Sequence, residues 1–173
     1  MPITRTPIID DSGDGRSGTV IDNAWKQELY DQIDGTTGTA GWTPYTVSWR
    51  TDGGWPTVGN GVLSGRYAIV GKTCHVAIIT GFGSTTGIGT GGMYQWTVPF
   101  TARLVPGVAA QQNIWPVGML GAGGAAQPPA LGYGLSADLI YVLTSVGGLV
   151  GPTSPFTWGA GMLITIRGAY ELP

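Results

Sequence analysis

The chain has 173 residues, of which 42% are hydrophobic, and its formal net charge at pH 7 is −2. Only 10% of the residues are charged, against about 25% in an average soluble domain, so we expect much of the surface to face other protein chains. The single cysteine excludes an intrachain disulfide framework, and the near-neutral charge gives no reason to expect nucleic-acid binding. The alternative is a monomer with a surface of Ser, Thr and Gly.

Two kinds of targeting segment are not predicted. The first residues, Met-Pro-Ile-Thr-Arg, form no apolar core of a signal peptide. No stretch of about 18 apolar residues occurs, so we expect no membrane insertion.

The first 34 residues differ in charge from the rest. They hold seven acids and three bases, a net charge of −4, whereas residues 35–173 hold three acids and five bases, a net charge of +2. Residues 1–18 contain two prolines and show no hydrophobic period, which predicts an extended arm that becomes ordered on a partner.

Residues 19–34 are predicted to form a short helix. Thr19 can cap its first turn, and Gly35 follows as a stop. An apolar stripe recurs every four residues and is expected to pack in an oligomer or on an anchoring partner; it consists of Ile21, Trp25, Leu29 and Ile33. The composition of residues 35–41 predicts a linker.

From residue 42 onward the hydrophobic period becomes that of β-strands. Strands are predicted at 66–71 and 73–80, split by a turn at Gly71-Lys72, and at 43–50, 93–98, 102–106, 113–120, 138–144 and 162–170. In the last run, Ile164, Ile166 and Tyr170 share one face. Residues 121–129 are predicted to form a loop. The pattern predicts an all-β fold, a single jelly-roll-like β-sandwich over 42–173, preceded by the arm and the helix.

Two motifs resemble ligand-binding sequences, and each also has a simpler interpretation. Residues 87–92 match G-x-G-x-x-G, but a strand pattern follows in place of a helix, which favours a glycine turn. Asp10, Ser12 and Asp14 resemble the first half of a calcium loop, yet the place of the closing glutamate is taken by Ile21, which favours an acidic turn. The sequence therefore predicts that no metal or cofactor is required.

No catalytic set is predicted either. His75 and Cys74 are each single and lie in an apolar run, which indicates packed strand residues. Asp52, Asp138 and Glu171 are the only acids after residue 34, so a pair of glycosidase carboxylates stays open as an alternative. We expect a chain that is not an enzyme.

The aromatic residues are the stronger indication of function. Trp42, Tyr45, Trp49 and Trp55 lie close together in a stretch with few aliphatic residues. Such rings stack on sugar faces or fill subunit interfaces, and the alternative is packing in the core. Trp55, flanked by Gly54 and Pro56, is the first candidate for contact with a receptor, and Trp49 is the second.

An ordered series of short motifs carries a family resemblance. The series consists of Trp42-Thr-Pro44, Gly65-Arg-Tyr67, Gly71-Lys72, Phe82-Gly-Ser84, Trp96-Thr-Val-Pro99, Pro155-Phe-Thr-Trp158 and Gly168-Ala-Tyr-Glu171. Over about residues 41–173 the chain resembles jelly-roll-like β-sandwich domains in virion proteins of tailed bacteriophages. The resemblance implies a non-enzymatic role in a fibre, spike, tail or decoration component, often as a homotrimer.

The sequence therefore predicts a phage virion protein that is assembled in the host bacterial cytoplasm. Residues 1–34 would anchor it to other virion proteins, and the β-sandwich would project outward and contact a host surface glycan. The alternative is a decoration or minor structural protein of the capsid or tail, which serves particle stability and assembly without binding a receptor.

Overall fold

The computed structural model describes residues 26, 29–30, 41–107 and 113–173. Its tertiary contacts divide the chain into two units, with the boundary between Ala40 and Gly41. The predicted arm, most of the predicted helix and the linker up to residue 40 lie outside the described residues. Lys26, Leu29 and Tyr30 are helical in backbone and exposed.

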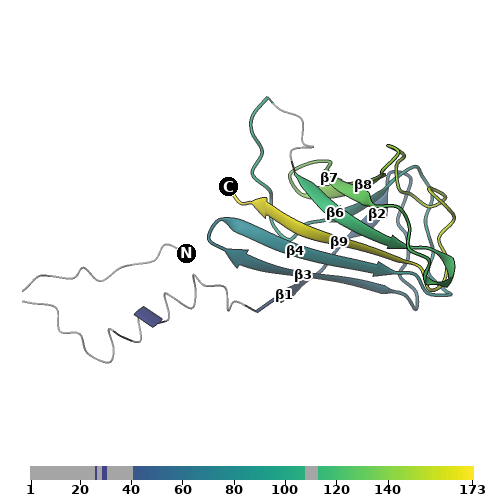
Figure 1. The fold of residues 1–173 in the computed structure, drawn as a ribbon, viewed down its shortest axis with the longest axis horizontal. Coiled ribbons are helices and arrows are strands. Elements are labelled where there is room, and N and C mark those ends of the chain that lie inside the picture. Colours follow the sequence, from purple (N-terminus) through teal and green to yellow (C-terminus); the bar gives the residue numbers. More distant parts are fainter. Residues whose placement is uncertain (1–25, 27–28, 31–40, 108–112) are drawn as a thin grey trace, which may run out of the picture. The chain divides into compact units, whose positions relative to one another are not determined.

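The second unit is an antiparallel β-fold (Figure 1). Its strands are β1 (Thr43–Tyr45), β2 (Trp49–Thr51), β3 (Val62–Val70), β4 (Thr73–Gly81), β5 (Tyr94–Thr97), β6 (Ile114–Leu120), β7 (Ala130–Gly134), β8 (Leu139–Thr144) and β9 (Leu163–Glu171). The other named element is a short 3-10 turn, η2 (Ala122–Gly124). The prediction of an all-β, sandwich-like fold is confirmed.

The strands form one curled sheet in the order β1-β3-β4-β9-β6-β7-β8-β5-β2. β1 and β2 lie at opposite edges of this sheet, yet only residues 46–48 connect them, so the sheet must curl until its edges are close together. The hydroxyl of Tyr45, in β1, donates to the carbonyl oxygen of Thr97, in β5, at 3.0 Å. The curl folds the sheet into two layers that face each other.

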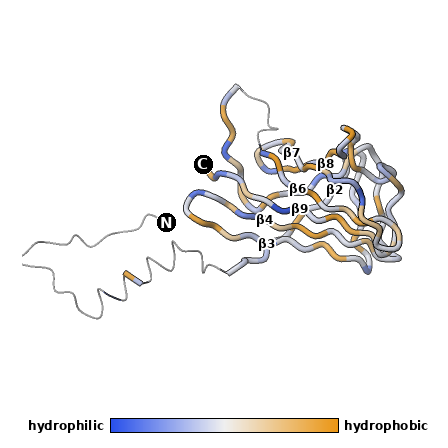
Figure 2. The backbone as a smooth tube through the Cα atoms, in the orientation of Figure 1, coloured by the Kyte–Doolittle hydropathy of each residue, from blue (hydrophilic) through white to orange (hydrophobic). Residues whose placement is uncertain are grey.

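The core lies between these layers, and it is apolar because alternate residues of each strand point inward. Ile164, Ile166 and Tyr170 of β9 share one face, as predicted, and this face is buried, whereas Arg167 is exposed. The indole Nε1 of Trp96, in β5, donates to Oγ1 of Thr80, in β4, at 2.9 Å. Since both residues are buried, this bond links the two layers through the interior. Figure 2 shows hydrophobic residues recurring along the strands, between more polar ones.

Glycines inside strands make room for the largest core side chains. A Cβ built on Gly168 would lie 2.4 Å from Cδ1 of Trp115, whose ring packs over the β9 backbone. A Cβ on Gly65 would lie 2.6 Å from the ring of Tyr45. Glycine in a strand interior often marks such a close approach, and here it lets aromatic rings fill the space between layers.

The strand registers give the β-domain two distinct ends. Val62, Gly81, Leu163 and Leu120 lie at one end, which we call the Trp55 end; it carries the loops 52–61, 82–93, 121–129 and 145–162. The opposite end, the Lys72 end, carries the turn at 71–72, the connection 135–138 and the C-terminal residues. Thr43 pairs with Tyr67, so the chain enters β1 from the side of the Lys72 end.

Three strand predictions differ from the structure. The predicted strand 43–50 is split into β1 and β2, which diverge to opposite edges of the sheet. The predicted strand 102–106 is wrong, because these residues make isolated backbone bonds, such as Arg103 N–H to the carbonyl oxygen of Glu171 at 2.8 Å. β7 was not predicted, since two of its five residues are glycines.

Candidate functional site

A short strand pair builds one wall of the candidate site, which lies at the Trp55 end. Arg50, in β2, is the register partner of Gln95, in β5. Nε of Arg50 donates to Oε1 of Gln95 at 2.9 Å, which fixes the guanidinium against the amide. A guanidinium has five N–H donors, so this bond leaves most of the donor capacity of Arg50 for a ligand.

The chain turns sharply after β2. The N–H of Thr51 donates to the carbonyl oxygen of Gly54 at 2.8 Å, and its hydroxyl contacts the same oxygen at 3.0 Å and the carbonyl oxygen of Thr90. Trp55 follows this turn, and its side chain is 67% exposed. Because the turn is fixed by these bonds, the exposed ring stands on an ordered loop.

Asp52 joins this turn to the glycine-rich loop before β5. Its Oδ1 accepts from the backbone N–H of Gly92 at 2.6 Å and from that of Met93 at 3.2 Å. The N–H groups of Met93 and Gly92 hold the pKa of the Asp52 carboxyl below its ordinary value. Asp52 is therefore an ionised carboxylate at neutral pH, held in place while it remains exposed to solvent.

Glycines allow the two loops to touch. Gly91 has φ +114, and a Cβ there would lie 2.3 Å from Oδ1 of Asp52 and 2.6 Å from the backbone nitrogen of Gly53. The loop 87–92 is thus a glycine turn between strands, as predicted, because β5 follows it directly. Its glycines bring backbone N–H groups against a carboxylate of the chain itself.

These residues enclose a shallow pocket of about 370 Å³ that is open to solvent. It is lined by Arg50, Thr51, Asp52, Gly54, Trp55 and Gln95. The pocket combines an exposed aromatic face, guanidinium and amide groups, and an ionised carboxylate. Such a set can hold a small polar ligand by ring stacking and by hydrogen bonds in both directions.

The other predicted contact residue, Trp49, lies elsewhere. It is only 4% exposed, and its ring packs against Phe82 and Tyr94 at centroid distances of 5.5 and 5.1 Å. Alternation along β2 explains this, since Trp49 points inward where Arg50 points outward. The structure thus brings Trp55 and Arg50 into one pocket and places Trp49 in the core, where it offers no surface to a receptor.

Several predicted site residues fall outside the described part of the chain. They are the calcium-like Asp10, Ser12 and Asp14 and three members of the apolar stripe, Ile21, Trp25 and Ile33. The fourth member of the stripe, Leu29, is 37% exposed.

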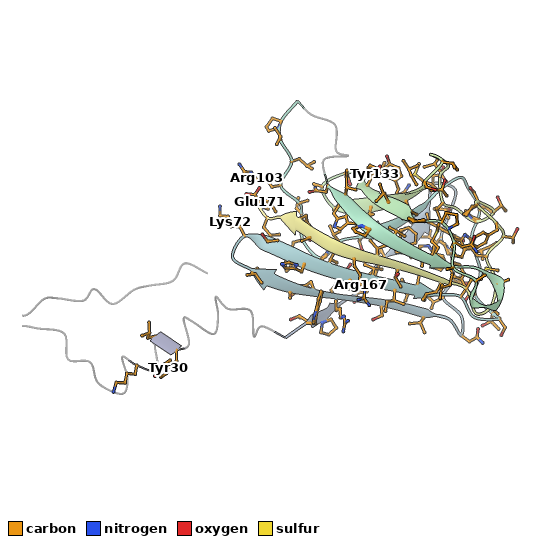
Figure 3. The ribbon with its side chains drawn as sticks, in the orientation of Figure 1. Tyr30, Lys72, Arg103, Tyr133, Arg167 and Glu171 are labelled. Carbon is orange, nitrogen blue, oxygen red and sulfur yellow. The ribbon has the colours of Figure 1, made fainter. Side chains whose placement is uncertain are left out.

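The residues considered for catalysis are dispersed within the described part. Cys74 is buried, and burial raises the pKa of its thiol. Glu171 pairs with Arg103 at the Lys72 end (Figure 3), whereas Asp52 directly follows β2 at the Trp55 end. Residues 41–107 and 113–173 contain no group of three or more His, Cys, Asp or Glu that could hold a metal ion. Among the described residues, no helix is long and apolar enough to span a bilayer.

Comparisons of the chain with protein-family models, curated proteins and solved structures find no match. The resemblance to phage virion proteins therefore rests on the ordered motifs of residues 41–173.

The sequence did not predict Arg50 or Gln95 as site residues, and it offered Asp52 only as one carboxylate of a possible glycosidase pair. A partial signal was present, because Arg50 and Asp52 come just before the glycines Gly53 and Gly54 that precede Trp55. Gln95 lies more than 40 positions away, and only the pairing of β2 with β5 brings it to the pocket.

Proposed function

We propose that the chain is a structural protein of a tailed-phage virion, a fibre, spike or tail component whose β-domain projects from the particle. The observation that supports this proposal is the position of the Trp55 pocket. It lies at the end of the β-domain opposite to the side from which the chain enters β1. An exposed aromatic loop at the end of the β-domain away from Thr43 suits a receptor contact.

We propose further that the protein assembles as a homotrimer. Strands β6, β7 and β8 contain no charged residue, and their outer face exposes Ile114 (53%) and Leu131 (42%). Beside them the rings of Tyr133 and Tyr141 lie 5.9 Å apart. An uncharged, apolar outer face of this kind supports burial against further copies of the chain.

Incorporation into particles tests the virion role. Mass spectrometry and immunogold labelling of purified particles of the virus that encodes the chain should detect it as a stoichiometric component. Deletion of residues 1–18 should leave a folded protein that no longer joins the particle. Particles without the chain, or full incorporation of the truncated chain, would contradict the proposal or the role of the arm.

Light scattering tests the oligomer. The full chain should have a mass three times that of the 17.9 kDa protomer, and Trp25→Ala or Ile114→Asp should lower it. A monomer at micromolar concentration would contradict the trimer. Particles that lose stability but keep normal adsorption when the chain is absent would favour the decoration alternative.

A further inference from the structure

We propose that the Trp55 pocket binds neutral hexose units, an inference that deepens the proposed function and rests on it for the source of the sugar. The preference for a neutral hexose is inferred from three features of the pocket. They are an exposed ring on an ordered loop, pre-positioned polar groups of both kinds, and a formal charge of zero.

The ring is the first feature. Trp55 is 67% exposed, whereas Trp49, Trp96, Trp115 and Trp158 are at most 4% exposed. The turn before it is closed by the hydrogen bond from the Thr51 N–H to the Gly54 carbonyl oxygen, so the ring is exposed on a defined loop. A hexose has an apolar face of C–H groups, which gains by leaving water against an indole ring.

The polar groups are the second feature. Sugar hydroxyls both donate and accept, so a hexose needs donors and acceptors on fixed positions. Arg50 is held by Gln95 at 2.9 Å and keeps its remaining N–H donors. Asp52 is held by Gly92 and Met93 and keeps acceptor capacity. Arg50, Asp52 and Gln95 line the pocket, and these hydrogen bonds position them before a ligand arrives. Such pre-positioning lowers the entropy cost of binding.

Charge decides between a neutral and an anionic ligand. Arg50 and Asp52 are the charged groups that line the pocket, and their formal charges cancel. An anionic sugar or phosphate would meet the Asp52 carboxylate as well as the guanidinium. A neutral hexose uses both groups without an uncompensated charge.

The size and openness of the pocket set the expected affinity. Its volume of about 370 Å³ is at the lower end of the range of roughly 300–1,000 Å³ for small-molecule sites. For one hexose stacked on one ring in an open pocket, we expect a dissociation constant of the order of 1 mM. Tight attachment to a surface would then need several pockets in one oligomer acting together.

Ligand-observed saturation-transfer NMR on the full chain tests the binding. Methyl glycosides of glucose, galactose and mannose are titrated into the tens of millimolar, with methyl glucuronide and inorganic phosphate as anionic comparisons. At least one neutral hexoside should saturate the protein and bind more tightly than either anion. Trp55→Ala should weaken binding about tenfold or more, and Trp55→Phe should keep part of it.

Trp42→Ala is the matched control, because Trp42 is 46% exposed but stacks on Arg66 outside the pocket, at 5.0 Å. It should leave binding unchanged. Absence of saturable binding by every neutral hexoside, tighter binding of an anion, or equal losses in Trp42→Ala and Trp55→Ala would overturn the inference. A fall in oligomer mass in Trp55→Ala would also overturn it, since Trp55 would then be a subunit contact.

Two further measurements separate the source of the sugar from its chemistry. Polymeric host-surface glycan should bind the oligomer far more tightly per hexose than the methyl glycoside does, whereas equal affinities indicate a free sugar. Binding by the isolated chain is measured without particles. Sugar binding together with absence from particles would therefore contradict the virion role alone, and incorporation without sugar binding would contradict this inference alone.

Discussion

The two ends of the β-domain are held together by different interactions. At the Trp55 end, loops contact one another through backbone groups at Gly53 and Gly91, and Asp52 binds two backbone N–H groups. At the Lys72 end, Arg103 and Glu171 form an exposed ion pair at 2.6 Å, near Lys72 (Figure 3). Backbone contacts leave little room for side-chain variation, whereas exposed ion pairs are easily replaced. The end that carries the pocket should therefore be the more sensitive to substitution.

The largest effect is expected in the core that supports both ends. Trp96→Ala removes a ring that is 0% exposed, together with its bond to Thr80, and should lower the free energy of unfolding by about 3–5 kcal/mol. Trp55→Ala should change it by no more than about 0.5 kcal/mol, because the ring is on the surface. Urea denaturation followed by circular dichroism measures both values.

Equal losses of unfolding free energy in Trp55→Ala and Trp96→Ala would contradict this prediction. If Trp96→Ala does not fold, Trp96→Phe takes its place in the measurement. It keeps most of the ring but leaves the Thr80 hydroxyl without the indole donor, so a smaller loss of about 1–3 kcal/mol is expected.

A pair of glycine substitutions compares the two ends directly. Gly91→Ala places a Cβ 2.3 Å from Oδ1 of Asp52 at a φ of +114, and backbone strain alone should cost about 1–3 kcal/mol. Gly71→Ala, at the Lys72 end, has φ +59 and nothing within 4 Å, so only about 1–2 kcal/mol is expected. Thermal denaturation compares the two variants, and equal losses would contradict the difference between the ends.

Much of the fold could be predicted because the strands carry a strong local pattern. The runs around Val76 and Ile166 alternate inward and outward residues, and their turn at Gly71-Lys72 is marked by glycine. β7 could not be predicted, because its glycines have no side chain to show a period. Gly132 leaves room for two buried side chains, since a Cβ at this position would lie 3.1 Å from Ile140 and 3.5 Å from Trp115.

The pocket was only partly predictable, for a physical reason. The exposure of Trp55 follows from its local turn of glycines and a proline, which the sequence displays. The contribution of Gln95 depends on which strand pairs with β2, and the sheet order is decided by packing of the whole core. The hydrogen bond from the Gly92 N–H to Asp52 likewise joins positions 40 residues apart, so it could not be predicted from local sequence.

Acid should weaken the Trp55 end through Asp52. Because the pKa of its carboxyl is lowered in the folded chain, its contribution to stability is complete above the ordinary pKa of an aspartate. That contribution is lost as the pH falls through the lowered value. Asp52→Asn keeps an oxygen for Gly92 and Met93 but removes the charge, so it should lack this part of the acid loss. Melting temperatures of both proteins between neutral pH and pH of about 2 measure the difference. Parallel profiles would show that the other carboxyls account for the acid sensitivity.

The smallest effect is expected from the ion pair at the Lys72 end. Both side chains are more than half exposed, at 59% for Arg103 and 52% for Glu171, so water screens their attraction. A double-mutant cycle of Arg103→Ala and Glu171→Ala should give a coupling energy below about 1 kcal/mol, which falls further in high salt. The backbone bond from the Arg103 N–H to the Glu171 carbonyl oxygen, at 2.8 Å, does not depend on either side chain and should keep the segment in place. A coupling above about 2 kcal/mol, insensitive to salt, would mean that this pair is desolvated in the assembled protein, and the Lys72 end would then be an interface between chains.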